Sequence, residues 1–263
     1  MNTANVGCLL IVTALVPLLS NCNLTITEPD STVEHREPFA FTKPVAARNE
    51  LSISNINGNI TVTGVDTLNE VRISGAKIGR DETLEEDKQR VGEIRVDIIE
   101  PPTMLSIKSS YPNNESTRQY RVDYEIHVPS SWRVVASNVN GAVSILNIKN
   151  RTKTTITSGT LDAKEIVGDL GANRTNGSIT ANMTLPLNAL CALETLSGTI
   201  TLTVPRTTSA EVSASAINGA ISVSNLPLVL RTSSRTFVTG TLRAGQGTIR
   251  LSTLNGTMTL TGF

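Results

Sequence analysis

The chain has 263 residues, of which 39% are hydrophobic but only 3% aromatic, and its formal net charge is zero. So few aromatic side chains argue against one bulky core and favour thin layers of β-branched residues. Charge is uneven, with 18 acidic and 12 basic residues in 1–132 and 5 acidic and 11 basic residues in 133–263. The basic residues are scattered and lack interleaved aromatic residues, which argues against nucleic-acid binding.

Residues 1–22 have the pattern of an export signal. Residues 6–19 are almost wholly apolar, and this length fits a signal-peptide core better than a membrane span. The run LSNC that ends at Cys22 resembles a bacterial lipobox, although Asn21 stands where Gly, Ala or Ser is usual and residues 1–5 contain no Lys or Arg. We expect export and lipidation of Cys22; the alternative is a nearby cut that leaves Cys22 as a free thiol.

The three cysteines do not form a disulfide framework. Cys8 would be removed with the signal, and Cys22 would carry the lipid. Cys191 lies in an apolar run, which predicts a small buried side chain.

Residues 23–49 contain Pro29, Pro38 and Pro44 with little periodicity, which predicts a tether. A single domain is expected over 50–263. Its first unit, residues 50–64, alternates into and out of the turn pair at Gly58, a strong turn signal.

Residues 65–132 interrupt this pattern and predict an inserted strand–helix–strand segment. The helix is expected over about 81–91, with Asp81 as its N-cap and Gly92 as its stop. Strands are expected over 94–99, 104–108 and 121–128, the last with strict alternation of apolar and polar residues.

Residues 133–263 predict regular rungs. Here, and once before the insertion, a Gly follows a small polar residue and opens an alternating strand; the glycines are Gly58, Gly141, Gly159, Gly177, Gly198, Gly219, Gly240 and Gly256. From Gly141 on they are 18, 18, 21, 21, 21 and 16 residues apart. A period of about 20 residues predicts an all-β stack of the β-solenoid or β-helix type, with two or three strands per rung and Gly at each corner.

These motifs together resemble a known family. The units LSISNINGNITVTG and VVASNVNGAVSI, the run YRVDYEIHVPSSW and the rungs TSGTLDA, TNGSITA, LSGTITL and INGAISV are similar to the bacterial DUF4097 adhesin domain and the related head domain of auto-transporter adhesins. The resemblance covers roughly residues 45–263. It implies a β-solenoid-like fold, frequent export or lipid anchoring, and no catalytic residues that could be carried over.

The sequence contains few patterns that indicate catalysis, metal binding or cofactor binding. His35 and His127 are not spaced as metal ligands, and neither a calcium-binding nonapeptide repeat nor a nucleotide loop is present, so we expect no metal or cofactor. A polysaccharide-active β-helix enzyme would need two nearby carboxylates, for which Asp162 and Asp169 are the candidates. Solvated corner acids explain them equally well.

We therefore expect a non-enzymatic, exported and lipid-anchored β-solenoid of the bacterial cell envelope, used for surface adhesion or envelope scaffolding. Its partners would be the membrane, through the lipid, and a glycan or an envelope protein, since a repetitive Thr, Ser and Asn surface suits weak multivalent contacts. Two alternatives stay open: a periplasmic sensor or accessory module that binds through a sheet edge or the basic C-terminal side, and the β-helix enzyme.

Overall fold

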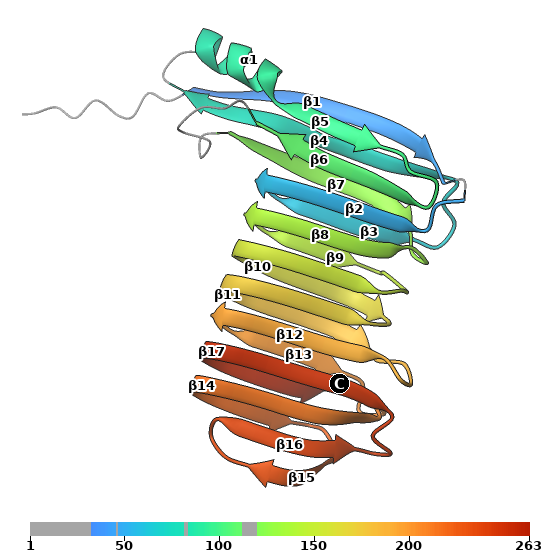
Figure 1. The fold of residues 1–263 in the computed structure, drawn as a ribbon, viewed down its shortest axis with the longest axis vertical. Coiled ribbons are helices and arrows are strands. Elements are labelled where there is room, and N and C mark those ends of the chain that lie inside the picture. The colour runs from blue at the N-terminus through green and yellow to red at the C-terminus, as the bar shows by residue number, and fades with distance from the viewer. Residues whose placement is uncertain (1–32, 46, 82–83, 112–119) are drawn as a thin grey trace, which may run out of the picture. The chain divides into compact units, whose positions relative to one another are not determined.

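The strands of the computed structural model form one continuous hydrogen-bonded sheet that folds into two layers packed face to face (Figure 1). The structure describes residues 33–45, 47–81, 84–111 and 120–263. The predicted signal, Cys8 and Cys22 lie outside these residues. The elements in chain order are β1 (Val33–Pro44), β2 (Glu50–Asn57), β3 (Ile60–Val65), β4 (Glu70–Asp81), α1 (Leu84–Glu93), β5 (Arg95–Ile99), β6 (Met104–Ser110), β7 (Arg121–Pro129), β8 (Arg133–Asn140), β9 (Val143–Leu146), β10 (Thr152–Val167), β11 (Leu170–Thr184), β12 (Leu190–Ser197), β13 (Ile200–Val204), β14 (Ala210–Ser224), β15 (Leu228–Ser233), β16 (Phe237–Leu242) and β17 (Gly247–Gly262).

Each regular rung contains two strands joined at a glycine corner. We call sheet 1 the strands and half-strands that precede the corner, and sheet 2 those that follow it. In the first rung β2 belongs to sheet 1 and β3 to sheet 2; β10, β11, β14 and β17 run through the corner and contribute one half to each. Neighbouring rungs pair in parallel, for example Leu161 with Ile179. The expected all-β solenoid is confirmed, with two strands per rung.

A narrow apolar core lies between the sheets because side chains alternate in direction along every strand. In β13, the inward residues Ile200, Leu202 and Val204 are fully buried, whereas Thr201 and Thr203 between them are partly exposed. Each such aliphatic side chain contributes roughly 1.5–3 kcal/mol when buried. Many thin layers of this kind replace the large aromatic core that the composition excludes.

Seven of the eight expected corner glycines form a ladder along the stack. A Cβ atom built on each would collide with the carbonyl oxygen of the rung before it; for example, that of Gly141 would meet the Gly58 oxygen, and that of Gly159 the Gly141 oxygen. The glycines are therefore required by the close approach of neighbouring backbones. The ladder runs in the order Gly58, Gly141, Gly159, Gly177, Gly198, Gly256 and Gly219.

This order shows that the final rungs do not follow the sequence. Strand β17 lies between the rung of β12 and β13 and the rung of β14, pairing in parallel with both. Strand β14 is followed instead by the antiparallel hairpin of β15 and β16 (Figure 1). The prediction of a corner at Gly240 is wrong, because Gly240 lies within β16 and faces Val212 and Leu230 across antiparallel pairs.

The insertion builds the other end of the stack. Strands β6 and β7 form a rung next to β2 and β3, and β5, β4 and β1 extend it with antiparallel pairs. The expected tether over 23–49 is wrong over Val33–Pro44, which form β1. This strand accommodates Pro38 and Pro44 because it is an edge strand whose only strand partner in the described chain is β4.

The helix begins later than expected and extends further. Asp81 ends β4 instead of capping the helix, and Leu84–Glu93 runs through Gly92. Val91 is buried in the core, while Leu84 is 40% exposed. The helix packs on β4 and β1, where the Asp87 carboxylate accepts the backbone N–H of His35 at 2.8 Å.

Candidate functional site

A groove crosses the outer face of sheet 1 over β10, β11, β12, β17 and β14. It consists of two adjoining cavities of about 340 and 360 Å³, and Asn173 and Glu194 line both. The groove runs along the stack, so each rung contributes to its floor or walls.

The strand register explains the first cavity. Lys153, Gly171 and Ala192 are direct neighbours in one outward row, followed by Arg250. Two small residues between two long basic side chains leave a hollow. The next outward row contributes Asn173 and Glu194, so amide and carboxylate groups border a floor that lacks bulky side chains.

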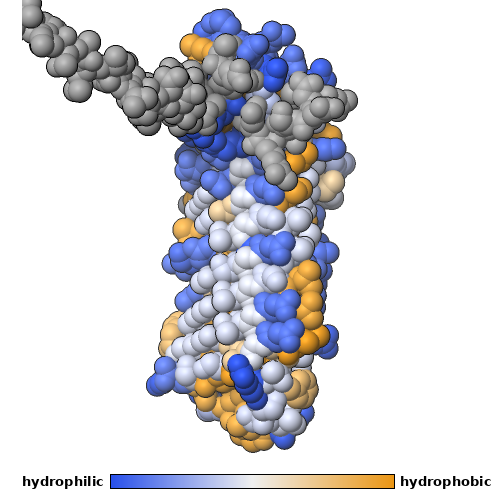
Figure 2. All heavy atoms as spheres, turned by 90° about the vertical axis from the view of Figure 1, so that its left-hand side faces the viewer, coloured by the Kyte–Doolittle hydropathy of each residue, from blue (hydrophilic) through white to orange (hydrophobic). Residues whose placement is uncertain are grey.

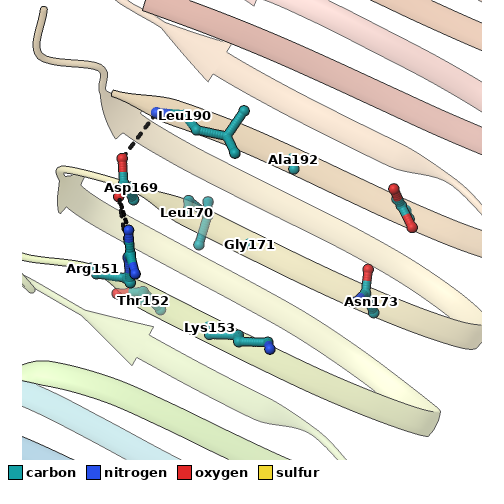
Figure 3. Close-up of a pocket in the computed structure, with 10 residues that line it drawn as sticks. Arg151, Thr152, Lys153, Asp169, Leu170, Gly171, Asn173, Leu190 and Ala192 are labelled. Atoms are coloured by element: carbon teal, nitrogen blue, oxygen red, sulfur yellow. Dashed lines mark hydrogen bonds and ion pairs between the residues drawn. The ribbon is translucent and has the colours of Figure 1, made fainter. Parts of the chain in front are cut away.

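The Asp169 carboxylate lies at one end of this cavity and forms hydrogen bonds to residues of the neighbouring rungs (Figure 3). Asp169 Oδ2 accepts two hydrogen bonds from Arg151, one from Nε at 3.1 Å and one from Nη2 at 3.0 Å. Its Oδ1 accepts the backbone N–H of Leu190 at 2.9 Å. Asp169 thereby ties three successive rungs together at the turn edge, and Leu190, 40% exposed, provides an apolar wall.

The second cavity is more apolar on one side. Leu196, Leu254 and Ile217 follow one another in an outward row just before the corners, and Ile217 is 67% exposed. Ser252 and Ser215 continue the row of Asn173 and Glu194 on the other side. Below this row the buried Arg174 side chain donates a hydrogen bond from Nε to the Asn176 carbonyl at 3.1 Å. This bond stabilises the glycine corner of the rung to which Arg174 belongs. Burial lowers the pKa of this guanidinium.

The outer face of sheet 2 carries hydroxyl side chains. Thr180, Thr201, Thr259 and Ser222 form one outward row across β11, β13, β17 and β14. This row provides the Thr and Ser part of the expected repetitive polar surface. Figure 2, which faces the left-hand side of Figure 1, shows pale columns of weakly polar residues along the side of the stack where the strands of sheet 1 end.

The structure does not bring the candidate catalytic acids together. Asp162 lies on sheet 2 in an ion pair with Lys164 at 2.6 Å, whereas Asp169 lies at a turn edge of sheet 1 with Arg151. His35 lies in β1 and His127 on the outer side of β7. Among the described residues no three His, Cys, Asp or Glu side chains are grouped as a metal would require.

Cys191 occupies the core, as expected. Its side chain is fully buried, and desolvation raises the pKa of its thiol to about 12. A thiol in this state is neutral and shielded, which makes it unsuited to nucleophilic chemistry. In the described part of the chain, no helix is long and apolar enough to cross a membrane.

Sequence reasoning missed the groove residues, notably Lys153, Gly171, Asn173 and Ala192. The available signal was a small residue, Gly171 or Ala192, at an outward strand position. That signal becomes informative only when the register places both in one row.

Comparison with known proteins confirms the resemblance seen in the sequence. The family model described as Toastrack DUF4097 matches residues 19–261. No curated protein matches the chain.

Among solved structures, the chain is similar to a "putative cell adhesion protein" from Clostridium sporogenes ATCC 15579, with 11% identity, coverage of 86% of this chain and 100% of that chain, and a TM-score of 0.47. It is also similar to a "putative adhesin" from Bacteroides fragilis NCTC 9343, with 12% identity, coverage of 86% and 97%, and a TM-score of 0.40.

Proposed function

Because the chain belongs to the Toastrack DUF4097 family, we propose its function from the surface that its stacked strands build: non-enzymatic adhesion at the bacterial cell surface through binding of a glycan chain. The groove on sheet 1 carries this proposal. Its length spans several rungs, so a polymer with repeating units contacts equivalent positions on successive strands. Weak contacts of this kind add up through multivalency.

The chemistry of the groove suits a sugar better than a charged polymer. Lys153 and Asn173 donate hydrogen bonds, and Asn173 and Glu194 accept them, which matches hydroxyl groups that do both. Leu190 and Ala192 offer apolar surface to the C–H side of a sugar ring. Cations and anions are present together, so the groove does not select one sign of charge.

We also propose that the protein is exported and anchored to a membrane by a lipid on Cys22. The apolar run 6–19 and the lipobox-like end at Cys22 support a lipoprotein that is held at the bacterial envelope through its N-terminus. Metabolic labelling with a palmitate analogue tests this. The wild-type protein should take up label and Cys22→Ser should not; equal labelling of both would refute the anchor.

Blocking the groove tests the adhesion proposal. A Cβ atom on Gly171 meets nothing within 4 Å, so Gly171→Gln adds a side chain in the cavity without strain. We expect this variant to bind a glycan array at least tenfold more weakly than wild type, with an unchanged unfolding midpoint. Thr180→Gln on sheet 2 is the matched control and should bind as wild type does.

Two results would overturn adhesion through the groove. One is equal glycan binding by Gly171→Gln and wild type. The other is cleavage of a bound polysaccharide, which would favour the enzyme alternative; Asp162→Ala and Asp169→Ala would then show which acid is needed.

A further inference from the structure

One strand edge at the C-terminal end of sheet 1 is free in the described chain. Strand β15 pairs with β16 along one side, and β16 pairs with β14, while no described strand pairs with the other side of β15. A free edge presents a row of backbone N–H and C=O groups that another strand can use. Figure 1 shows this hairpin at the lower end of the stack.

The side chains at this edge are unusually apolar for an exposed strand. Val229 is 69% exposed and Leu230 is 54% exposed, and neighbouring Phe237 is 41% exposed. Hydrophobic surface is visible at this lower end in Figure 2. Natural edge strands usually avoid such surface because it promotes association.

The two sides of β15 differ in character. Leu228 pairs with buried Leu242 and packs against the core, so Leu228 and Leu230 lie on the core side of sheet 1. Arg231 lies on the outer side, where it forms an ion pair with Glu211 at 3.0 Å. Val229 also lies on the outer side, opposite Thr241, so a strand added at this edge would meet only apolar groups on the core side, and Val229 and a cation on the outer side.

The local charge is strongly positive. Residues 195–263 contain five arginines and one acidic residue, a net charge of +4, and Arg235 projects from the β15–β16 turn. Arg231 shares the single acid, Glu211, with the hydroxyl of Thr241. The end of the stack thus favours an acidic partner.

The hairpin turn holds the edge in an extended conformation before any partner arrives. Ser234 Oγ accepts the backbone N–H groups of Thr236 at 3.3 Å and Phe237 at 2.9 Å, and the Ser234 N–H donates to the Phe237 carbonyl at 2.8 Å. A pre-ordered edge lowers the entropy cost of adding a strand.

We propose that β15 receives an extended segment of another protein as an additional strand of sheet 1, with acidic and apolar residues alternating along that segment. Backbone hydrogen bonds supply the affinity, and the alternation supplies the selectivity. The acidic residues face Arg231 on the outer side, and the apolar residues cover Leu228 and Leu230 on the core side.

A second copy of this chain fits the edge less well. Antiparallel pairing of two β15 strands about a twofold axis would bring the two copies of Arg231 together near the axis, where like charges repel. The site also differs from the groove, so its occupancy is independent of the glycan proposal.

Synthetic peptides test the proposal. We expect a seven-residue peptide of alternating Asp and Val to bind at least tenfold more tightly than one of alternating Lys and Val, measured by fluorescence anisotropy. Binding should slow amide hydrogen exchange in residues 228–233. N-methylation of alternate peptide residues should abolish both effects, because it removes the donors that pair with the edge.

Charge exchange sharpens the test. Arg231→Glu should reverse the preference in favour of the Lys and Val peptide, whereas Arg95→Glu, which changes the net charge equally at β5, should leave it unchanged. If Arg231→Glu disturbs the hairpin, Arg235→Glu is the second variant and should weaken Asp and Val binding at least threefold.

Three outcomes would overturn the proposal: equal binding of both peptides, binding without slower exchange in 228–233, or binding that the Gly171→Gln groove variant removes. Retention on vesicles of anionic lipid with no peptide binding would assign the edge to a membrane. Concentration-dependent dimerisation in sedimentation that excludes the peptide would assign it to a second copy.

Discussion

At the residue scale, the corner glycines are required mainly because a Cβ atom would collide with the neighbouring rung, and less because glycine permits a positive φ. Gly219 belongs to the ladder although its φ is not in the left-handed region, because a Cβ atom there would meet the Gly256 oxygen. Gly171, by contrast, has open space around it. The same residue type thus has opposite roles at different positions of one stack.

This contrast leads to a prediction for two alanine substitutions. Gly256 has φ +151° and its Cβ would collide with the backbone of Gly198, so Gly256→Ala should lower the free energy of unfolding by about 3 kcal/mol. Gly171→Ala should raise it by about 0.5–1 kcal/mol, because alanine loses less conformational entropy in a strand. Urea denaturation measures both, and equal effects would contradict the ladder.

At the element scale, helix α1 is attached through one tight contact. A Cβ atom on Gly79 of β4 would collide with the Asp87 carboxylate and with a methyl group of Val91. The Asp87 carboxylate in turn covers the edge of β1 by accepting the His35 N–H. The helix therefore depends on a glycine that belongs to the sheet.

Gly79→Val should detach this helix and leave the rungs folded. We expect amide exchange in residues 84–93 to become at least ~10-fold faster, while β8 to β13 keep their protection. Hydrogen exchange measured by mass spectrometry separates the two regions, with Gly92→Ala as control because its Cβ meets nothing within 4 Å. Uniform loss of protection would show instead that the helix is integral to the stack.

At the scale of the whole molecule, the position of β17 makes the C-terminal rungs interdependent. Within the described chain β14 pairs only with β17 and β16. A solenoid built in sequence order would lose one rung when its last strand is removed. Here the loss of β17 separates β14, β15 and β16 from the rest of the stack.

Truncation after Gln246 tests this dependence. We expect residues 210–242 to lose protection from hydrogen exchange, and β8, β10 and β11 to retain it. Retained protection of β14 in the truncated protein would mean that β14 pairs directly with β12 and β13.

The rungs were predictable from the sequence because alternation and corner glycines are local signals. The order of rungs was not, since β14 and β17 share the same pattern of an alternating strand, an Asn-Gly corner and a second alternating strand. The edge strand β1 was hidden by its prolines, which an edge tolerates. The groove depends on register across several rungs, so Gly171 and Ala192 carried no recognisable signal alone.

The place of β17 also bears on how the protein reaches its native state. Strand β14 is synthesised first and carries the same alternation and corner as β17, so it pairs transiently with the vacant edge of β12 and β13 in the same register, too weakly to stay protected from exchange when β17 is absent. When β14 pairs early with β12 and β13, it occupies the edge to which β17 must bind. The hydrogen bonds of this early pairing have to break before β17 can add to the stack. Refolding from urea should therefore show a slow phase that disappears when β17 is removed, because the late-made strand is the one that has to displace its neighbour.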